Sequence, residues 1–169
     1  MKLIPLTQGK FAKVDDADFE RLAAHKWFAW LHKRDNVWYA RRHAPTLPDG
    51  RRPTLGMHRE ILGLLSPQQQ ADHRDGDGLN NQRANLREST NRQNCCNKGK
   101  QRGTWTSPFK GVSWRKDRAK WASNIRVEGR LKHLGYFSSE AAAAQVYDVA
   151  ACHFHGEFAR LNFPSTFEN

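Results

Sequence analysis

The sequence predicts an α+β protein with three parts. These are a small N-terminal β-rich module, a middle module of strands and short helices around a polar loop, and a C-terminal three-stranded antiparallel sheet packed on one helix. The prediction comes from short aromatic segments with alternating polarity, turn-forming residues between them, and one small-residue helical segment near the C-terminus. The 169 residues include six Trp and nine Phe, which suits small cores and argues against wholesale disorder. A chain of this length holds one ordinary domain or two or three small ones.

The N-terminal module is expected over residues 1–56. "DDADFERLAAHKW" predicts a helix with Asp15 or Asp16 as its N-cap and apolar side chains on one face. "WFAWLH" and "VWYARRH" predict two strands joined by a turn at residues 33–36. "LPDGRR" then predicts another turn. No chemistry follows from this module by itself; DNA contacts from its arginines and a plain structural role stay open.

The middle module is expected over residues 57–98. "MHREILGLL" predicts a short helix that ends near Gly63 or at residues 66–67. "RDGDGLNNQ" predicts a tight connection, and a second helix begins after Ser89 or Thr90, both good N-caps. Asn91 and Asn94 then lie one turn apart on one face of that helix.

The C-terminal module is expected over residues 109–164, after a basic linker at 99–108. Three strands are predicted at 110–115, 121–127 and 131–137, with a hairpin turn in "VEGR". "SSEAAAAQVYDVAACHFHG" predicts a helix with Ser138 as N-cap and Gly156 at its end. The packing stripe predicted for this helix consists of Ala142, Val146, Tyr147, Ala150 and Phe154.

Charge indicates the class of partner. The chain has 28 Lys and Arg against 17 Asp and Glu, a net charge of +11 and a pI near 10.0. Eleven basic residues against two acidic ones fall within residues 98–132. This balance favours a polyanion, either nucleic acid or a membrane surface. No run approaches the ~18 apolar residues that span a bilayer, and no signal peptide is recognisable, so we expect a cytoplasmic protein with a nucleic-acid partner and no membrane partner.

The polar stretch "QADHRDGDGLNNQRANLREST" predicts a hydrolytic phosphodiester site. Asp72 and His73 are adjacent, Asn85 follows His73 by twelve residues, and Asn94 lies nine further on. A carboxylate and an amide oxygen can share a divalent cation, and a neighbouring imidazole can take a proton from water near neutral pH. The alternatives are an Asn- and Asp-rich turn cluster and a decayed nuclease that keeps only the fold.

The middle module resembles the HNH family of nucleases, whose fold is the ββα-metal (His-Me finger) fold, and is most similar to the homing-endonuclease branch of phages and mobile introns. The resemblance rests on "MHREILGL", "ADHRDGDGLNNQRANLREST" and "NRQNCCNKG". It implies that Asp72 and Asn94 hold one Mg²⁺ or Mn²⁺ ion, that His73 is the general base, and that Asn85 fixes the loop and orients His73. His58 is ambiguous between packing and participation. We expect no zinc, because the chain has three cysteines and no C-x-x-C pair.

The C-terminal module resembles the ethylene-response-factor (APETALA-two) type of DNA-binding domain, which also occurs fused to mobile HNH nucleases. "KGVSW", "KWASNIR", "HLGYF", "AAAAQVYDVAA" and "ARLNFP" match in order. The resemblance implies that the sheet enters the major groove of double-stranded DNA. Arg115 and Arg126 are the candidates for reading guanine. The predicted DNA-binding residues are Lys98, Lys100, Arg102, Lys110, Ser113, Arg115, Asn124, Arg126, Leu131, Lys132 and His133.

Three functional hypotheses follow. The first is a divalent-metal-dependent DNA endonuclease, encoded by a bacterial host or a phage, associated with the nucleoid, and acting as a monomer or weak dimer on DNA. The second is a non-catalytic, transcription-factor-like DNA-binding protein that keeps a nuclease scaffold. The third is RNA or structure-specific binding, which suits the sheet less well because A-form RNA hides its major groove.

Overall fold

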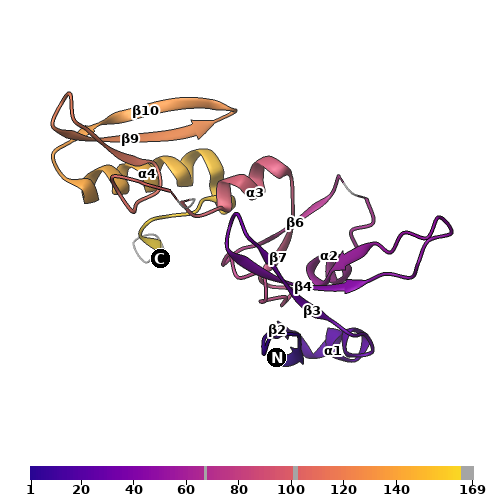
Figure 1. The fold of residues 1–169 in the computed structure, drawn as a ribbon. Helices are drawn as coiled ribbons and strands as arrows, with labels where there is room; N and C mark the ends of the chain where they lie inside the picture. The colour runs from indigo at the N-terminus through magenta and orange to yellow at the C-terminus, as the bar shows by residue number, and fades with distance from the viewer. Residues whose placement is uncertain (67, 101–102, 165–169) are drawn as a thin grey trace. The chain divides into compact units, whose positions relative to one another are not determined.

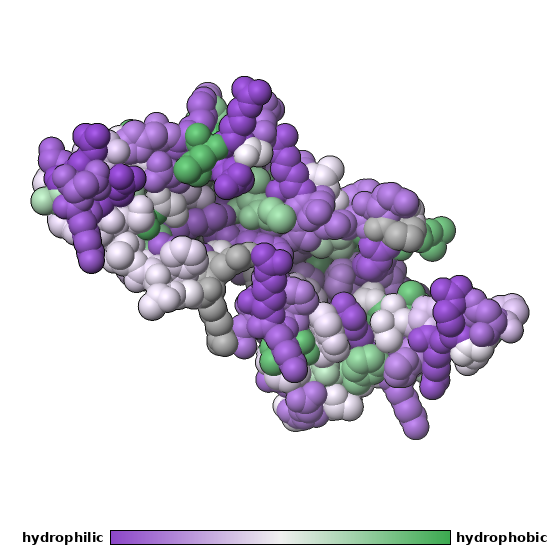
Figure 2. Space-filling model, turned by 45° about the horizontal axis from the view of Figure 1, so that its top comes forward, coloured by the Kyte–Doolittle hydropathy of each residue, from purple (hydrophilic) through white to green (hydrophobic). Residues whose placement is uncertain are grey.

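The structure is a computed structural model that describes residues 1–66, 68–100 and 103–164 (Figure 1). It divides into two compact units, Met1–Asn94 and Cys95–Asn169, which we treat separately. Both are built from small antiparallel sheets and helices, so the α+β class is confirmed. No helix in the described ranges is long and apolar enough to cross a membrane. The face drawn in Figure 2 is largely hydrophilic, as the high charge leads one to expect.

The N-terminal unit contains three antiparallel sheets, with strand orders β1-β2, β3-β4-β5 and β6-β7. The predicted helix after Asp15 and the two aromatic strands are present. Gly63 ends α2 with a positive φ of 67°, as a helix C-terminus favours. The elements are β1 Lys2–Pro5, β2 Phe11–Val14, α1 Asp16–Ala23, β3 Phe28–His32, β4 Val37–His43, β5 Thr54–Gly56, α2 Met57–Leu62, β6 Gln70–His73, β7 Leu86–Ser89 and α3 Asn91–Asn97, which continues into the second unit.

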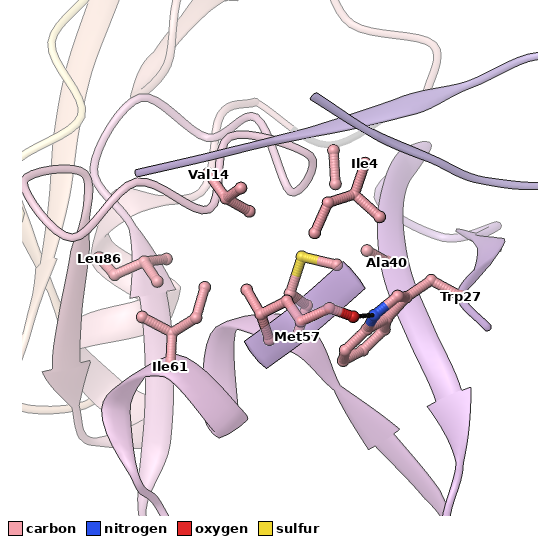
Figure 3. Packing of buried hydrophobic residues seen from close by; sticks show 9 residues of the cluster. Ile4, Val14, Trp27, Ala40, Met57, Ile61 and Leu86 are labelled. Atoms are coloured by element: carbon pink, nitrogen blue, oxygen red, sulfur yellow. Dashed lines mark hydrogen bonds between the residues drawn. The ribbon is translucent and has the colours of Figure 1, made fainter. Parts of the chain in front are cut away.

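One core holds this unit together (Figure 3). Met57 and Leu22 are fully buried at its centre, and the indole Nε1 of Trp27 donates to the carbonyl oxygen of Leu22 at 2.8 Å. The cluster contains Ile4, Ala12, Val14, Leu22, Trp27, Ala40, Met57, Ile61 and Leu86. The cluster takes residues from β1, β2, α1 and β4 before position 56 and from α2 and β7 after it, so the two segments share one hydrophobic core.

The helix α3, which follows the strands β6 and β7, begins where the sequence predicts. Thr90 and Gln93 form a reciprocal cap: the backbone N–H of Gln93 donates to Thr90 Oγ1 at 3.2 Å, and that of Thr90 donates to Gln93 Oε1 at 2.8 Å. This is a capping-box arrangement. It ends β7 and starts α3 at Asn91, so the elements β6, β7 and α3 follow in the order strand, strand, helix.

The C-terminal unit is a three-stranded antiparallel sheet packed on one long helix (Figure 1). Its strands are β8 Val112–Arg115, β9 Lys120–Val127 and β10 Arg130–Phe137, in the order β10-β9-β8. They are followed by α4 Glu140–His155 and the short 3₁₀ helix η1 Gly156–Phe158. Ile125 and Tyr147 pack between sheet and helix.

Two details of α4 differ from the sequence prediction. Its N-cap is Ser139, whose side chain accepts from the Ala142 N–H, and not Ser138. The predicted stripe is wrong in part, because Phe154 is 38% exposed. The buried face consists of Ala143, Ala144, Tyr147, Asp148 and Ala151. The sheet lies close to the helix, and alanines permit that approach where larger side chains do not.

Candidate functional sites

The polar loop between β6 and β7 is fastened to the rest of the N-terminal unit. The N–H of Lys13 on β2 donates to Leu79 O, and the Asn81 N–H donates to Lys13 O, both at 2.8 Å. The Arg83 guanidinium binds the buried carboxylate of Asp18 on α1 through two hydrogen bonds of 2.7 and 2.8 Å. The loop is therefore held in place by β2 and α1, which gives the first 56 residues a structural role.

Asn85 closes the loop internally. Its Nδ2 donates to Asp75 Oδ1 at 2.9 Å and to Asn80 O at 2.8 Å, and its Oδ1 accepts the Asp75 N–H at 3.1 Å. These bonds fit the expected loop-fixing role. The amide beside the imidazole is that of Asn81, whose Oδ1 lies 3.3 Å from His73 Nε2.

His73 lies in an aromatic environment. Its ring meets that of His58 at a centroid distance of 5.1 Å and that of Tyr39 at 5.8 Å. Burial lowers the pKa of His73, although the hydrogen bond with Asn81 opposes this. Burial, together with repulsion from His73, lowers the pKa of His58 to about 3. Both imidazoles are therefore neutral at pH 7, the form in which a histidine can accept a proton.

Asp72 and Asn94 have other neighbours. Arg87 on β7 donates to Asp72 Oδ2 from Nε at 2.8 Å and from Nη2 at 2.7 Å, and both residues are buried. Asn94 Nδ2 lies 3.4 Å from both Ala71 O and Gln70 Oε1. Successive strand side chains point to opposite faces, so Gln70 and Asp72 share a face of β6. This places the amide of Asn94 near the strand that carries Asp72.

The chemical types of the ligand atoms that Asp72 and Asn94 offer suit a hard divalent cation. Asp72 supplies a carboxylate and Asn94 an amide oxygen, the ligand types that Mg²⁺ and Mn²⁺ prefer. An arginine on one carboxylate oxygen is compatible with a metal on the other, because ligating carboxylates are commonly hydrogen-bonded by a further residue. Among the described residues, no group of three or more His, Cys, Asp or Glu side chains could hold a metal ion.

In the C-terminal unit, the sheet face opposite α4 is polar and basic. Val112, Ser123 and Ile125 point into the core, so alternation turns their neighbours outward. The outward residues also match across strands: Ser113 pairs with Ala122, Asn124 with His133 and Arg126 with Leu131. We call this set the outer face. It contains Ser113, Arg115, Lys120, Asn124, Arg126, Leu131, His133 and Tyr136.

The charged side chains of the outer face make few and exposed interactions with the rest of the protein. Arg115 binds Asp117 in the adjacent turn at 3.0 and 3.2 Å, and both side chains are about half exposed. Arg126 donates only to the carbonyl of Gly129 at 2.8 Å, and Lys120 is exposed. Solvent screens exposed pairs of this kind, so they stabilise the fold little and these cations can exchange partners for phosphates or bases.

Four of the predicted DNA-binding residues, Lys98, Lys100, Lys110 and Lys132, lie away from the outer face. The Lys110 ammonium donates to Cys96 O and Lys98 O at 2.5 and 2.7 Å, and burial lowers its pKa to about 8. Lys100 donates to two carbonyl oxygens, at 2.8 and 3.0 Å. Lys132 lies on the α4 side of the sheet, 4.5 Å from the ring centre of Phe154. Arg102 falls outside the described residues.

Sequence reasoning did not single out three residues that the structure brings to the polar loop: Tyr39, Asn81 and Arg87. Tyr39 reaches His73 from β4, the middle strand of the sheet β3-β4-β5, and Asn81 reaches it from within the loop. Arg87, in the quoted "NLR", lies in register with Asp72 across β6 and β7. The "NLR" motif was the one signal in the sequence that could have pointed to Arg87. Lys120 lies on the outer face because of its position on β9.

Comparisons with known proteins find two groups of relatives. Ethylene-responsive transcription factor WRI1 of Arabidopsis thaliana is 35% identical over 77 residues, which are 46% of this chain and 17% of that protein. Ethylene-responsive transcription factor ERF010 of Arabidopsis thaliana is 42% identical over 59 residues, 34% of this chain and 32% of that protein. The chain therefore spans less than a third of these plant proteins. No protein-family model matches the chain, and no solved structure matches it.

The second group is viral. Protein 3.8 of Escherichia phage T7 is 33% identical over 90 residues, which are 53% of this chain and 73% of that protein. This match is longer than the whole C-terminal unit, Cys95–Asn169, so it includes residues of the N-terminal unit.

Proposed function

The chain belongs to the family of Escherichia phage T7 Protein 3.8, and from that premise we propose that it binds double-stranded DNA through the outer face of its C-terminal sheet. One observation carries the proposal: the face opposite α4 presents Arg115, Lys120 and Arg126 without a buried ion-pair partner. The similarity to ethylene-responsive transcription factors supports it. So does the net charge of +11.

The proposed mechanism divides the outer face by contact type. A short antiparallel sheet fits the width of the B-form major groove. Arg126, on the central strand β9 beside the hairpin to β10, is the candidate for a bidentate contact with guanine. The cations at the β8–β9 turn, Lys116 and Arg118, are exposed and suit phosphate contacts.

Duplex binding by the full chain tests this proposal. We expect Arg126→Gln to weaken binding to its preferred duplex about tenfold or more, the usual size of a lost base contact. Lys120→Gln should lower the slope of log K against log salt by about 1. Lys26→Gln, which removes one exposed charge in the other unit, is the matched control. Binding that none of the outer-face variants changes would refute the proposal.

A second candidate function is a metal-dependent DNA endonuclease at the polar loop. The observation that favours it is a neutral imidazole, His73, beside a buried carboxylate, Asp72, in a loop that Asn85 closes. His73 would take a proton from water, and Asn81 would orient its ring. Asp72 and Asn94 would hold Mg²⁺ or Mn²⁺, which would stabilise developing charge on the phosphate when bound.

Cleavage assays decide this second candidate. Supercoiled plasmid is incubated with the full chain in Mg²⁺, in Mn²⁺ and in EDTA, alongside His73→Ala. Nicking that requires a metal and that the variant lacks supports the endonuclease. Duplex binding without cleavage under any of these conditions leaves the DNA-binding function alone.

A further inference from the structure

The sheet β3-β4-β5 has an outer face of unusual composition. Ala29 and Ala40, which pair across β3 and β4, are 5% and 0% exposed and point into the core. Alternation therefore turns their neighbours to the opposite face. We call this set the aromatic face. It contains Phe28, Trp30 and His32 from β3 and Tyr39, Arg41 and His43 from β4.

The rings of the aromatic face form two groups, the pair Phe28 and His43 and the set His32, Trp30 and Tyr39. Phe28 and His43 are 5.1 Å apart between ring centres, Trp30 and His32 are 5.5 Å apart, and Trp30 and Tyr39 are 6.3 Å apart. Five of the six residues are only partly buried, and His43 is exposed. Aromatic rings on the solvent side of a small sheet offer flat surfaces on which planar groups can stack.

Tyr39 connects the aromatic face to the polar loop. The Tyr39 ring lies 5.7 Å from that of His58 and 5.8 Å from that of His73. Gly78 of the loop lies so close to this strand that a Cβ there would be 2.7 Å from the Tyr39 ring. A ligand lying along the aromatic face therefore ends beside His73.

Arg41 is the cation of this face. Its guanidinium carbon lies 3.6 Å from the ring centre of Trp30, and no described residue gives it a carboxylate partner. Burial lowers its pKa, which means that part of its hydration is already lost. Five other arginines of the unit do have carboxylate partners: Arg21, Arg42, Arg51, Arg83 and Arg87.

A partly desolvated guanidinium without an anion is a costly arrangement in isolation. A phosphate would supply the missing charge, and the stacked geometry over Trp30 already fixes the orientation of the guanidinium. The hairpin that carries the face adds two exposed cations, Lys33 and Arg34, at its turn. Its residues 28–43 hold four basic side chains and one acidic one, Asp35.

We propose that the aromatic face binds an unpaired DNA strand, with bases stacked on Trp30 and Tyr39 and a phosphate on Arg41, and directs that strand to His73. Aromatic side chains interleaved with cations are the usual platform for single-stranded nucleic acid. Bases inside a duplex are already stacked on each other and do not offer their faces to a platform. The inference extends the proposed DNA-binding function to the N-terminal unit and rests on it for the choice of DNA as ligand.

Binding of the full chain to labelled oligothymidylate and to a duplex of the same length tests the inference. We expect Trp30→Leu and Arg41→Gln each to weaken oligothymidylate binding by about tenfold, the effect of losing one base stack. Binding to the duplex should change less than about twofold, because the outer face carries that contact. Phe11→Leu and Arg51→Gln are matched controls, since Phe11 is 52% exposed and Arg51 pairs with Asp49 in a surface turn.

A measurement on the unaltered chain guards against misfolded variants. Oligothymidylate containing 5-iodouracil is photocrosslinked to the protein, and the crosslinked peptide is identified by mass spectrometry. Crosslinks within residues 28–43 support the inference. Crosslinks confined to the C-terminal unit, or folded Trp30→Leu and Arg41→Gln proteins with unchanged oligothymidylate affinity, overturn it.

The same data separate this inference from the proposed function. If the unaltered chain fails to bind the duplex but binds oligothymidylate in a Trp30-dependent manner, the proposed function fails and the inference stands. If duplex binding depends on Arg126 while oligothymidylate binding is insensitive to Trp30 and Arg41, the inference fails alone.

Discussion

The imidazole rings of His58 and His73 meet edge to face, with their centres 5.1 Å apart and an interplanar angle of 71°. His58 comes from α2 and His73 from the end of β6. Nδ1 of His58 is buried without a hydrogen-bond partner among the described residues. Two protonated rings at this distance would repel each other, and burial penalises even one charge. The pair therefore makes the N-terminal unit sensitive to acid.

Stability of the N-terminal unit should fall as pH decreases below about 6.5. The pKa of His58 is about 3 in the folded chain and near 6.5 when unfolded, and that of His73 is lowered as well. Between these values the unfolded chain binds protons that the folded chain does not, so acid favours unfolding. The slope is at most about 1.4 kcal/mol per pH unit for each histidine. Urea unfolding followed by Trp fluorescence at pH 7 and pH 5 measures it.

His58→Phe is the control for this effect. Phenylalanine keeps a ring against His73 and Tyr39 but binds no proton. The loss of stability from pH 7 to pH 5 should therefore be smaller in the variant. An equal loss in both proteins would show that carboxylates, and not this histidine, dominate the acid response.

Asp18→Asn should weaken the attachment of the polar loop. The Arg83 side chain, and then Arg21, lower the pKa of Asp18 by donating to its carboxylate. Removing the negative charge leaves a buried amide facing two guanidinium groups. Because Arg83 is 55% exposed, the expected loss is moderate, about 1–3 kcal/mol. Chemical denaturation measures this loss.

The comparison variant is Arg51→Gln, which breaks an exposed pair with Asp49. It should leave the free energy of unfolding nearly unchanged, because solvent screens this pair. Faster amide hydrogen exchange at residues 79–83 in Asp18→Asn, and not in Arg51→Gln, would locate the effect in the loop. Equal exchange in the two proteins would contradict it.

Lys110→Met should destabilise the C-terminal unit without altering the salt dependence of DNA binding. The Lys110 ammonium donates to the carbonyls of Cys96 and Lys98, and losing these two hydrogen bonds costs about 1–3 kcal/mol. Thermal unfolding and salt-dependent duplex binding are measured on the same protein. Lys120→Gln should give the reverse pattern, with a lower salt slope and nearly unchanged stability. A reduced salt slope in Lys110→Met would mean that this lysine contacts phosphate after all.

Gly111→Ala should strongly destabilise the C-terminal unit. Gly111 has a φ of 79°, and a Cβ there would lie 2.0 Å from Tyr147 Cδ2 and 2.6 Å from Asn124 O. Strain and overpacking add, so the expected loss is on the order of 2–4 kcal/mol. Gly129→Ala separates the two causes. Its φ is 76° but nothing lies within 4 Å of the added atom, so only about 1 kcal/mol should be lost. Similar losses in the two variants would show that the contact with Tyr147 is not the cause.

Local patterns in the sequence determined much of the secondary structure. Alternating aromatic and polar residues marked β3, β4 and β9, and Gly63 and Gly156 marked the ends of two helices. These signals succeed because period, capping and positive φ depend on residues within a few positions of each other. The same signals predicted Ser138 as the N-cap of α4, one residue before the actual cap Ser139, since either serine can cap the helix.

Only tertiary structure decided which polar residues meet. The sequence placed Asp72, His73, Asn85 and Asn94 in one group, but the fold gives each a different neighbour: Arg87, His58, Asp75 and Gln70. It also turned Lys100 and Lys110 to backbone carbonyls. The sequence by itself determined a basic chain with a sheet-on-helix module. The packing of α1, β2 and β4 against the polar loop brings together residues up to 68 positions apart, and no local pattern records such contacts.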